Sequence, residues 1–126
     1  MKVLIDTHTF LWMAAEPEKL SARARDVCAT ETLVLSVASV WEIAIKYRTG
    51  RLLLPLAPES YIPRQVGFSR ATILPIHFAH AIRSGGLDSN HKDPFDRMIA
   101  SQCLEEGLPC VTRDPFFGTC GVPTIW

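Results

Sequence analysis

Four carboxylic acids along this chain stand where they could bind one cation together. Three lie at the ends or starts of elements that the sequence predicts, and one lies on a neighbouring helix. Acids at the carboxyl ends of parallel strands meet at one edge of an α/β sheet. Because several carboxylates cannot stay charged and unpaired in one place, a divalent cation is the expected counter-charge. The four acids are Asp6, Glu42, Asp96 and Asp114.

Two of the acids follow apolar runs that predict buried strands. Asp6 follows Val-Leu-Ile at residues 3–5, and Asp114 comes soon after Cys-Val-Thr at residues 110–112. Aspartate is also common in ordinary turns, and the sequence Arg-Asp-Pro around Asp114 is typical of one. Neither acid is evidence of a site by itself, and their predicted place at one sheet edge is what links them.

The two helical acids have structural interpretations as well. Glu42 precedes Lys46 by four residues, which is the favourable order for a solvated helix pair. Asp96 falls in the first turn of a helix that Asp93 caps and Pro94 opens, where an acid stabilises the helix dipole. The joint pattern of the four acids, rather than any one of them, predicts a metal site.

Carboxylate oxygens are hard ligands that suit Mg²⁺ or Mn²⁺, and these ions can activate water and relieve charge on a phosphoryl group. We expect Asp6 and Asp96 to bind the ion directly. We expect Glu42 and Asp114 to bind a second ion or to orient water. A general base or transition-metal site built on histidines is the alternative, but helical histidines are more often surface or packing residues. The histidines are His8, His77, His80 and His91.

The composition is that of one globular domain spanning residues 1–126. Hydrophobic residues make up 48% of the chain, which is enough for a core. Lys plus Arg and Asp plus Glu both number 13, so the net charge is zero. Because there is no basic excess, a nuclease built on this chain would need a local basic rim or a metal to hold a polyanion.

The cysteines and the lack of a long apolar run indicate the compartment. No Cys-x-x-Cys pair occurs, which argues against a zinc site. The first apolar stretch is short and is broken by Asp6 and His8, so neither a signal peptide nor a membrane span is expected. We expect a cytoplasmic protein with free, mostly buried thiols and no contact with a membrane.

Short strands alternate with helices along the whole chain. Strands are expected over residues 2–6, 33–35, 72–76, 109–112 and 123–125. Helices are expected over residues 8–15, 22–29, from 36 or 39 to about 48, 77–84 and 94–106, with a polar loop over 88–92. This alternation predicts an α/β fold, with a parallel sheet of about five strands and helices on both faces. Pro75 favours an edge position for the third strand.

Two segments carry more specific expectations. On the helix that ends near residue 48, one apolar stripe is expected to face the core, with Glu42 on its flank. Three prolines interrupt residues 51–68, where Pro58 could start a helix that Pro63 would then kink or end. The expected stripe consists of Val37, Val40, Trp41, Ala44, Ile45 and Arg48.

Four motifs, in this order along the chain, resemble those of PIN-domain proteins. They resemble in particular the small bacterial PIN proteins that act as VapC-type toxins of type II toxin–antitoxin pairs, and the likeness covers essentially the whole chain. The first and third motifs together are the most specific. The motifs are Ile5-Asp6-Thr7-His8, Ser39-Val40-Trp41-Glu42, His91-Lys92-Asp93-Pro94-Phe95-Asp96-Arg97 and Val111-Thr112-Arg113-Asp114.

The resemblance implies a three-layer α/β/α domain that acts as a metal-dependent endoribonuclease, with Mg²⁺ or Mn²⁺ held by the four acids. It also implies an RNA substrate, a cognate antitoxin protein and a homodimer, and it makes Thr112 the hydroxyl residue that orients groups in the site. Supporting roles are expected for Thr7, Asp93 and Arg97. Arg97 and Arg113 are candidates to neutralise phosphate, although Arg113 is more simply explained as a surface residue beside an acid.

An apolar helix near the N-terminus is the candidate contact for the antitoxin. Phe10, Leu11 and Trp12 spread too far round this helix to face one core, unless all three pack inside. The expected mode is an amphipathic partner helix laid in a groove, with an Arg or Lys that replaces the charge of the metal.

Two other functions fit the same fold. A non-catalytic partner-binding or phosphoacceptor module could use an aspartate at a strand end. Receiver-like chemistry, however, needs a lysine near the end of the last strand, and residues 121–126 contain none. A DNA-directed flap-type nuclease would need an arch around DNA, for which 126 residues leave little room.

Overall fold

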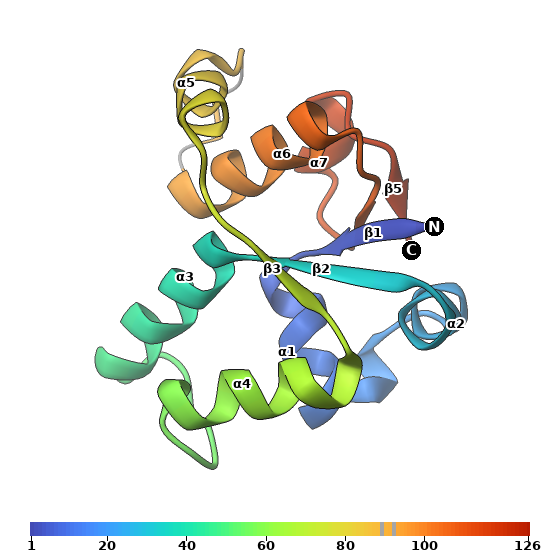
Figure 1. Ribbon diagram of the computed structural model, residues 1–126, viewed down its shortest axis with the longest axis vertical. Helices are drawn as coiled ribbons and strands as arrows, with labels where there is room; N and C mark the ends of the chain where they lie inside the picture. The colour runs from blue at the N-terminus through green and yellow to red at the C-terminus, as the bar shows by residue number, and fades with distance from the viewer. Residues whose placement is uncertain (89, 92) are drawn as a thin grey trace.

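The computed structural model describes residues 1–88, 90–91 and 93–126. Within these residues, a parallel sheet of five strands forms the centre, in the order β3-β2-β1-β4-β5 (Figure 1). The expected parallel sheet is confirmed, and β3 takes the edge position that Pro75 favours. The strands are β1 (Lys2–Ile5), β2 (Thr32–Ser36), β3 (Thr72–Leu74), β4 (Cys110–Val111) and β5 (Thr124–Ile125).

Helices cover both faces of the sheet, which gives the expected three-layer α/β/α architecture (Figure 1). One face carries α1 (Thr7–Ala15), the short 3-10 helix η1 (Pro17–Lys19), α2 (Ala22–Thr30) and α4 (Pro58–Ser69). The other face carries α5 (Phe78–Gly86), α6 (Pro94–Glu106) and the short α7 (Phe116–Thr119). Helix α3 (Val37–Arg48) continues directly from β2 and packs against both α4 and α6.

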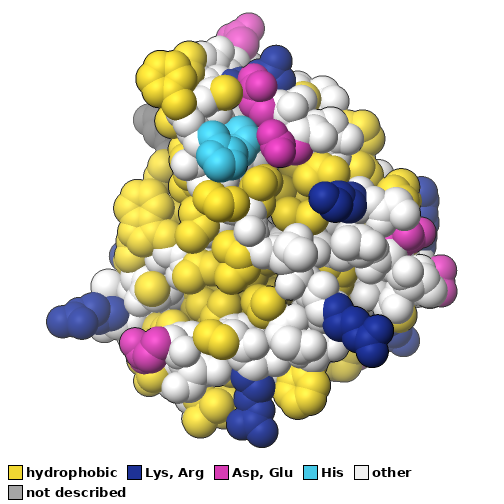
Figure 2. Space-filling view, in the orientation of Figure 1, with side chains coloured by type: hydrophobic (Ala, Val, Ile, Leu, Met, Phe, Trp, Pro, Cys, Tyr) yellow, Lys and Arg dark blue, Asp and Glu magenta, His cyan; other side chains and the backbone are white. Residues whose placement is uncertain are grey.

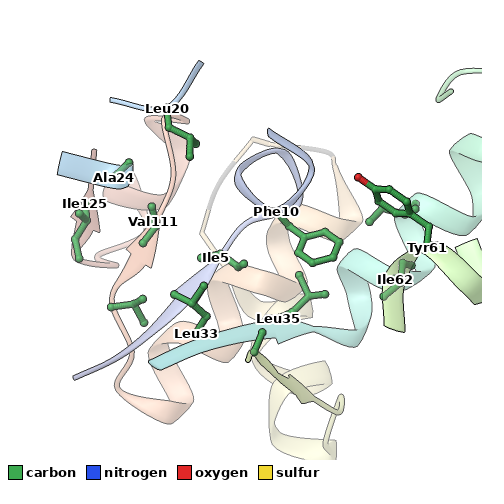
Figure 3. Close-up of a cluster of buried hydrophobic side chains, with 13 residues drawn as sticks. Ile5, Phe10, Leu20, Ala24, Leu33, Leu35, Tyr61, Ile62, Val111 and Ile125 are labelled. Atoms are coloured by element: carbon green, nitrogen blue, oxygen red, sulfur yellow. The ribbon is translucent and has the colours of Figure 1, made fainter. Parts of the chain in front are cut away.

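Alternate residues of the strands supply the two halves of the core. Val3 and Ile5 of β1 belong to the half that lies against α1, α2 and α4, whereas Leu4 belongs to the half against α6 and α7. Figure 3 shows the first half, in which Phe10 and Tyr61 come from helices on that face. A parallel sheet that is covered on both faces needs apolar side chains in both directions, and the short apolar runs supply them.

The helix ends follow the signals in the sequence. The side chains of Ser21, Ser36 and Asp93 accept hydrogen bonds from backbone N–H groups at the starts of α2, α3 and α6. Gly107 ends α6 in the left-handed conformation with φ of +66°. Helix α6 therefore has the predicted bounds, and the end of β2 passes directly into α3 without a loop.

The expectation was that Pro63 would kink or end a helix in residues 51–68, and helix α4 shows that the helix does not end there. Pro58 occupies the first turn as expected, but the helix continues through Pro63 to Ser69. Pro63 is exposed, so the Glu59 carbonyl that loses its hydrogen-bond donor lies on the solvent side of the helix. The buried neighbour Ile62 fixes the helix from its inner side and offsets the lost hydrogen bond.

The apolar stripe expected on α3 is wrong, because the helix turns a different face inward. Trp41 is 57% exposed, and Ala44 and Ile45 are exposed as well. The inner face includes two polar residues, Ser39 and Glu42, which can be buried because each has a hydrogen-bond partner. The predicted stripe therefore leaves apolar side chains on the outside of the molecule. The buried residues of α3 are Ala38, Ser39, Glu42 and Ile43.

Smaller differences concern the short elements. Helices η1 and α7 were not predicted, and α5 continues through Gly85 to Gly86 rather than ending at residue 84. The polar loop expected over 88–92 includes residues 89 and 92, which lie outside the described residues. The four cysteines are free as expected, but only Cys103 and Cys110 are fully buried. Within the described residues, no helix is long and apolar enough to cross a membrane.

Candidate metal centre

The candidate site lies where the spatial order of the strands reverses. Strands β2 and β3 extend from one side of β1, and β4 and β5 extend from the other. Such a reversal opens a crevice beyond the carboxyl ends of the central strands, here β1 and β4. An open hollow of about 310 Å³ is present there. It is lined by Asp6, His8, Trp12, Arg113, Asp114 and Pro115.

Asp6 and Asp114 are linked through Thr112. Asp6 follows β1 and caps α1, and its Oδ1 accepts a hydrogen bond from the Thr9 N–H at 2.8 Å. The Thr112 hydroxyl donates to Asp6 Oδ2 at 2.5 Å and accepts from the Asp114 N–H at 3.0 Å. Asp114 Oδ1 in turn accepts from the Phe116 N–H at 2.9 Å. Both predicted acids are therefore fixed at one edge of the sheet.

Asp96 lies in the first turn of α6, and its environment is crowded with negative charge. Burial raises the pKa of Asp96 from 3.8 to about 6, and its hydrogen bond with His91 opposes this rise. The negative charges of Asp93, Glu42 and Asp114 add to the rise in pKa. The His91 Nε2 atom lies 2.9 Å from Asp96 Oδ2. The like-charge crowding that the sequence predicts is therefore present around Asp96.

Glu42 reaches the same region from α3, which packs against α6. Its side chain is only 3% exposed, so its contact with Lys46 is not the solvated pair that the spacing suggested. Lys46 Nζ lies 2.5 Å from Glu42 Oε2. The other oxygen, Oε1, is buried and has no hydrogen-bond partner among the described residues. Leaving a buried carboxylate oxygen unpaired is unfavourable, and a bound cation would satisfy it.

Two observations relate the four predicted acids to one region of the molecule. One is the hydroxyl bridge between the ends of β1 and β4, and the other is the charge coupling around Asp96. The described residues also contain a compact group whose possible ligand atoms all lie within 4.8 Å of one another. That group shares only Asp96 with the predicted four. It consists of His91, Asp93 and Asp96.

Two of the supporting residues hold the elements of the site in place. The Thr7 hydroxyl donates to Ser39 Oγ at 2.9 Å, which ties the start of α1 to α3 in the interior. Asp93 Oδ1 accepts from the N–H groups of Phe95 and Asp96 at 2.9 and 3.3 Å, which caps α6. Asp6 and Asp96 are therefore each anchored at a helix start.

The two arginines make contacts of other kinds. Arg97 donates to the backbone carbonyl oxygens of Ser84, Leu87 and His91 at 2.9 to 3.2 Å, which ties α6 to the chain that follows α5. The Arg113 guanidinium lies 4.8 Å from the centre of the Trp12 ring, at the rim of the hollow. A role of either arginine toward phosphate stays a prediction.

Two residues have a larger part in the site than the sequence indicated. From the sequence, His91 was a candidate only for the alternative site built on histidines, but it contacts the Asp96 carboxylate and stacks on Phe116, with 4.1 Å between ring centres. Lys46 was expected only as the solvent-exposed partner of Glu42. The spacing of each to its acid was visible in the sequence, but the burial of these contacts depends on how α3 and α6 pack.

These contacts define a class of protein: a three-layer α/β/α domain with carboxylates gathered at the carboxyl edge of a parallel sheet, suited to a hard divalent cation. The PIN domain matches residues 3–118 of the chain. The chain belongs to the PIN-domain family, as its four motifs suggested.

Two proteins of Mycobacterium tuberculosis (strain ATCC 25618 / H37Rv) are similar in sequence. The chain is 30% identical to Ribonuclease VapC22 over 115 residues, which are 89% of this chain and 86% of that protein. It is 44% identical to Ribonuclease VapC16 over 57 residues, which are 43% of this chain and 40% of that protein. The expected likeness to VapC-type proteins is thereby confirmed.

Two solved structures share the fold. VapBC2 from Rickettsia felis, bound to a DNA fragment from its promoter, matches with a TM-score of 0.71 and 14% identity, over 98% of this chain and 97% of that one. DNA-bound VapBC from Salmonella typhimurium matches with a TM-score of 0.68 and 22% identity, over 98% and 96%. At these identities the likeness extends to the fold.

Proposed function

We propose that this protein is a divalent-metal-dependent endoribonuclease that acts as the toxin of a type II toxin–antitoxin pair. The observation that carries the proposal is the Oε1 atom of Glu42, a buried carboxylate oxygen beside further acids that has no hydrogen-bond partner in the described part of the chain. The names of its relatives, Ribonuclease VapC22 and VapC16, support the choice of RNA as substrate.

The residues present fit Mg²⁺ or Mn²⁺. The donors are carboxylate oxygens, which such ions prefer, and the acids repel one another until a cation is bound. Asp6 and Asp96 would hold the ion directly, with Glu42 and Asp114 completing the site. When bound, the ion supplies charge stabilisation for a phosphoryl group and lowers the pKa of a bound water.

Other residues of the site hold these acids in a fixed position. Thr112 keeps Asp6 and Asp114 in register by donating to one and accepting from the backbone of the other. His91 orients Asp96 through Oδ2. Arg113 stands at the rim of the hollow, where a phosphodiester would approach. Fixed geometry of this kind favours catalysis, because the acids need not rearrange when the substrate binds.

An antitoxin is the proposed protein partner, and a groove beside α1 is its proposed contact. Phe10 is 2% exposed and belongs to the core, so the expectation that it helps to form a groove was wrong. Leu11 and Trp12 do line a hollow of about 250 Å³ between α1, α3 and residues 51–55. An amphipathic helix of the antitoxin laid there would lie next to the acidic site.

We also propose a homodimer, supported by the apolar side chains on the outside of the molecule. We call Trp41 and Ile45 of α3, with Phe78 and Ile82 of α5, the outer apolar face; all four are exposed. Figure 2 shows hydrophobic side chains gathered over these two helices. Exposed apolar surface on two helices that both pack against α6 is typical of a protein interface.

Growth of a bacterial host tests the proposed toxicity. Induction of the wild type is expected to arrest growth, because RNA is cleaved, whereas Asp6→Ala is expected to be harmless at the same protein level. Co-expression with the product of the adjacent small gene is expected to restore growth and to yield a complex that co-purifies. Equal arrest by the wild type and Asp6→Ala would favour a non-catalytic binding module instead.

A further inference from the structure

Lys46 contacts the candidate metal centre at one of its buried carboxylates. Its Nζ atom lies 2.5 Å from Glu42 Oε2, and the two residues are one helical turn apart on α3. The lysine side chain is 34% exposed, whereas the glutamate side chain is 3% exposed. The ammonium group therefore reaches inward from the surface to a carboxylate that water does not reach.

Lys46 also lines a hollow at the surface of the molecule. It lines the hollow beside α1 together with Thr7 and His8, which follow Asp6 in the chain. The ammonium thus lies between this hollow and the Glu42 carboxylate. Its positive charge offsets the negative charge of Glu42 in a region where Asp93, Glu42 and Asp114 already raise the pKa of Asp96.

This contact limits how Glu42 can serve a metal. Oε2 is in contact with the ammonium, whereas Oε1 is buried and has no hydrogen-bond partner among the described residues. Glu42 can therefore offer Oε1 to one ion, and the ammonium on Oε2 disfavours its use as a bridge between two ions while Lys46 stays in place. A second divalent cation near Oε2 would also be repelled by the ammonium group.

We propose that the Lys46 ammonium occupies the second cation position of this site, so that the protein binds one divalent ion, to which Glu42 contributes Oε1 alone. Lys46 is then a positioning residue that sets the number of metal ions. This inference rests on the proposed function, because that function assigns a divalent cation to the four acids.

The number of bound Mn²⁺ ions tests the inference. Calorimetric titration of the metal-free wild type is expected to give one Mn²⁺ per chain, and its electron paramagnetic resonance spectrum is expected to show isolated ions. Lys46→Met removes the charge and keeps most of the length, so it is expected to bind two Mn²⁺ per chain with the spectrum of a coupled pair. Lys46→Arg keeps the charge and is expected to bind one.

The results separate a failure of this inference from a failure of the proposed metal centre. Two ions in the wild type, or one ion in folded Lys46→Met, overturns the inference while the metal centre stands. If Lys46→Met does not fold, Lys46→Gln takes its place, and the wild-type stoichiometry is decisive without either. Absence of Mn²⁺ binding by the wild type, with Asp6→Asn/Asp96→Asn equally inert, overturns the proposed metal centre itself and the inference with it.

Discussion

At the scale of single residues, the Thr112 hydroxyl is the contact on which the geometry of two acids depends. It is 2% exposed, donates to Asp6 Oδ2 and accepts from the Asp114 N–H. Thr112→Val keeps the shape but leaves both partners unpaired. We expect the free energy of unfolding to fall by about 1–3 kcal/mol and RNA cleavage to fall roughly tenfold or more.

Urea unfolding and a cleavage assay measure these two effects. Thr112→Ser, which keeps the hydroxyl, is the matched control, and its cleavage rate is expected to stay close to that of the wild type. Equal loss of cleavage in the Val and Ser variants would show that the hydroxyl does not hold the acids.

Asp96 makes the metal-free protein sensitive to pH. Its pKa is raised by burial to about 6 from the ordinary 3.8, so between these values the folded protein binds the proton more strongly than the unfolded chain. The stability contributed by the protonated group is therefore lost as pH rises from about 4 to 6. Because the side chain is 20% exposed, we expect Asp96→Asn to raise the metal-free stability at pH 7 by only about 1 kcal/mol.

Thermal unfolding in a chelator between pH 4 and 8 measures this effect. The Asn variant is expected to show a flatter stability curve across pH 4–6, and to gain less than the wild type when Mg²⁺ is added. If the two proteins instead have the same pH dependence, Asp96 does not have the raised pKa.

The convergence of Asp6 and Asp114 could be predicted from their sequence contexts, but the burial of Glu42 could not. Asp6 and Asp114 were placed at one sheet edge because both follow apolar runs, and that required only the order of the elements. The burial of Glu42 depends on which face of α3 turns inward. That face is set by contacts with α1, α4 and α6, which no pattern within α3 contains.

At the scale of elements, the residues that start and end helices gave the most reliable predictions from the sequence. The bounds of α6 follow from Asp93, Pro94 and Gly107, whose local physics is independent of the rest of the fold. Helix α4 could not be predicted through Pro63, because its continuation depends on the burial of Tyr61 and Ile62 against the rest of the core. The direction of the apolar stripe on α3 also depends on the rest of the fold, because periodicity does not distinguish a core face from an outer apolar face.

Gly107 tests the physics of a helix end. Its φ of +66° is unfavourable for a residue with a Cβ atom, although nothing lies within 4 Å of the place where that atom would stand. Gly107→Ala is therefore expected to lower the free energy of unfolding by about 1 kcal/mol through the backbone alone. Gly67→Ala, inside α4 and equally uncrowded, is the matched control and is expected to raise it by about 0.5–1 kcal/mol.

Urea unfolding of both variants measures the two changes, which are predicted to have opposite signs. A loss of stability in both proteins would indicate crowding at these positions rather than backbone conformation.

At the scale of the whole molecule, the neutral charge and the outer apolar face favour contacts with protein partners. With 13 basic and 13 acidic residues, the molecule has no overall attraction for a polyanion. The proposed ribonuclease would therefore need local features to position RNA, and the candidate metal centre is the strongest of them. Apolar surface supports the proposal of protein partners, and it is present both beside α1 and on the outer apolar face.

The mass of the protein in solution tests the role of the outer apolar face. Light scattering is expected to give twice the 14.0 kDa of one chain for the wild type. Trp41→Ser/Phe78→Ser is expected to give a monomer, because two large exposed apolar side chains are lost from the interface. Phe68→Ser on α4 removes another largely exposed aromatic ring, outside this face, and is expected to stay dimeric. A wild type that is monomeric at all concentrations would contradict the proposed dimer.

Cleavage of single-stranded RNA by the purified protein, with and without divalent metal, tests the central claim most directly. The wild type is expected to cleave RNA in Mg²⁺, to lose activity in EDTA and to recover it when Mn²⁺ is restored. Glu42→Gln keeps the shape of the buried side chain but removes its charge, and its rate is expected to fall roughly a hundredfold or more. Cleavage that persists in EDTA, that is unchanged in Glu42→Gln, or that occurs on DNA and not on RNA would contradict the claim.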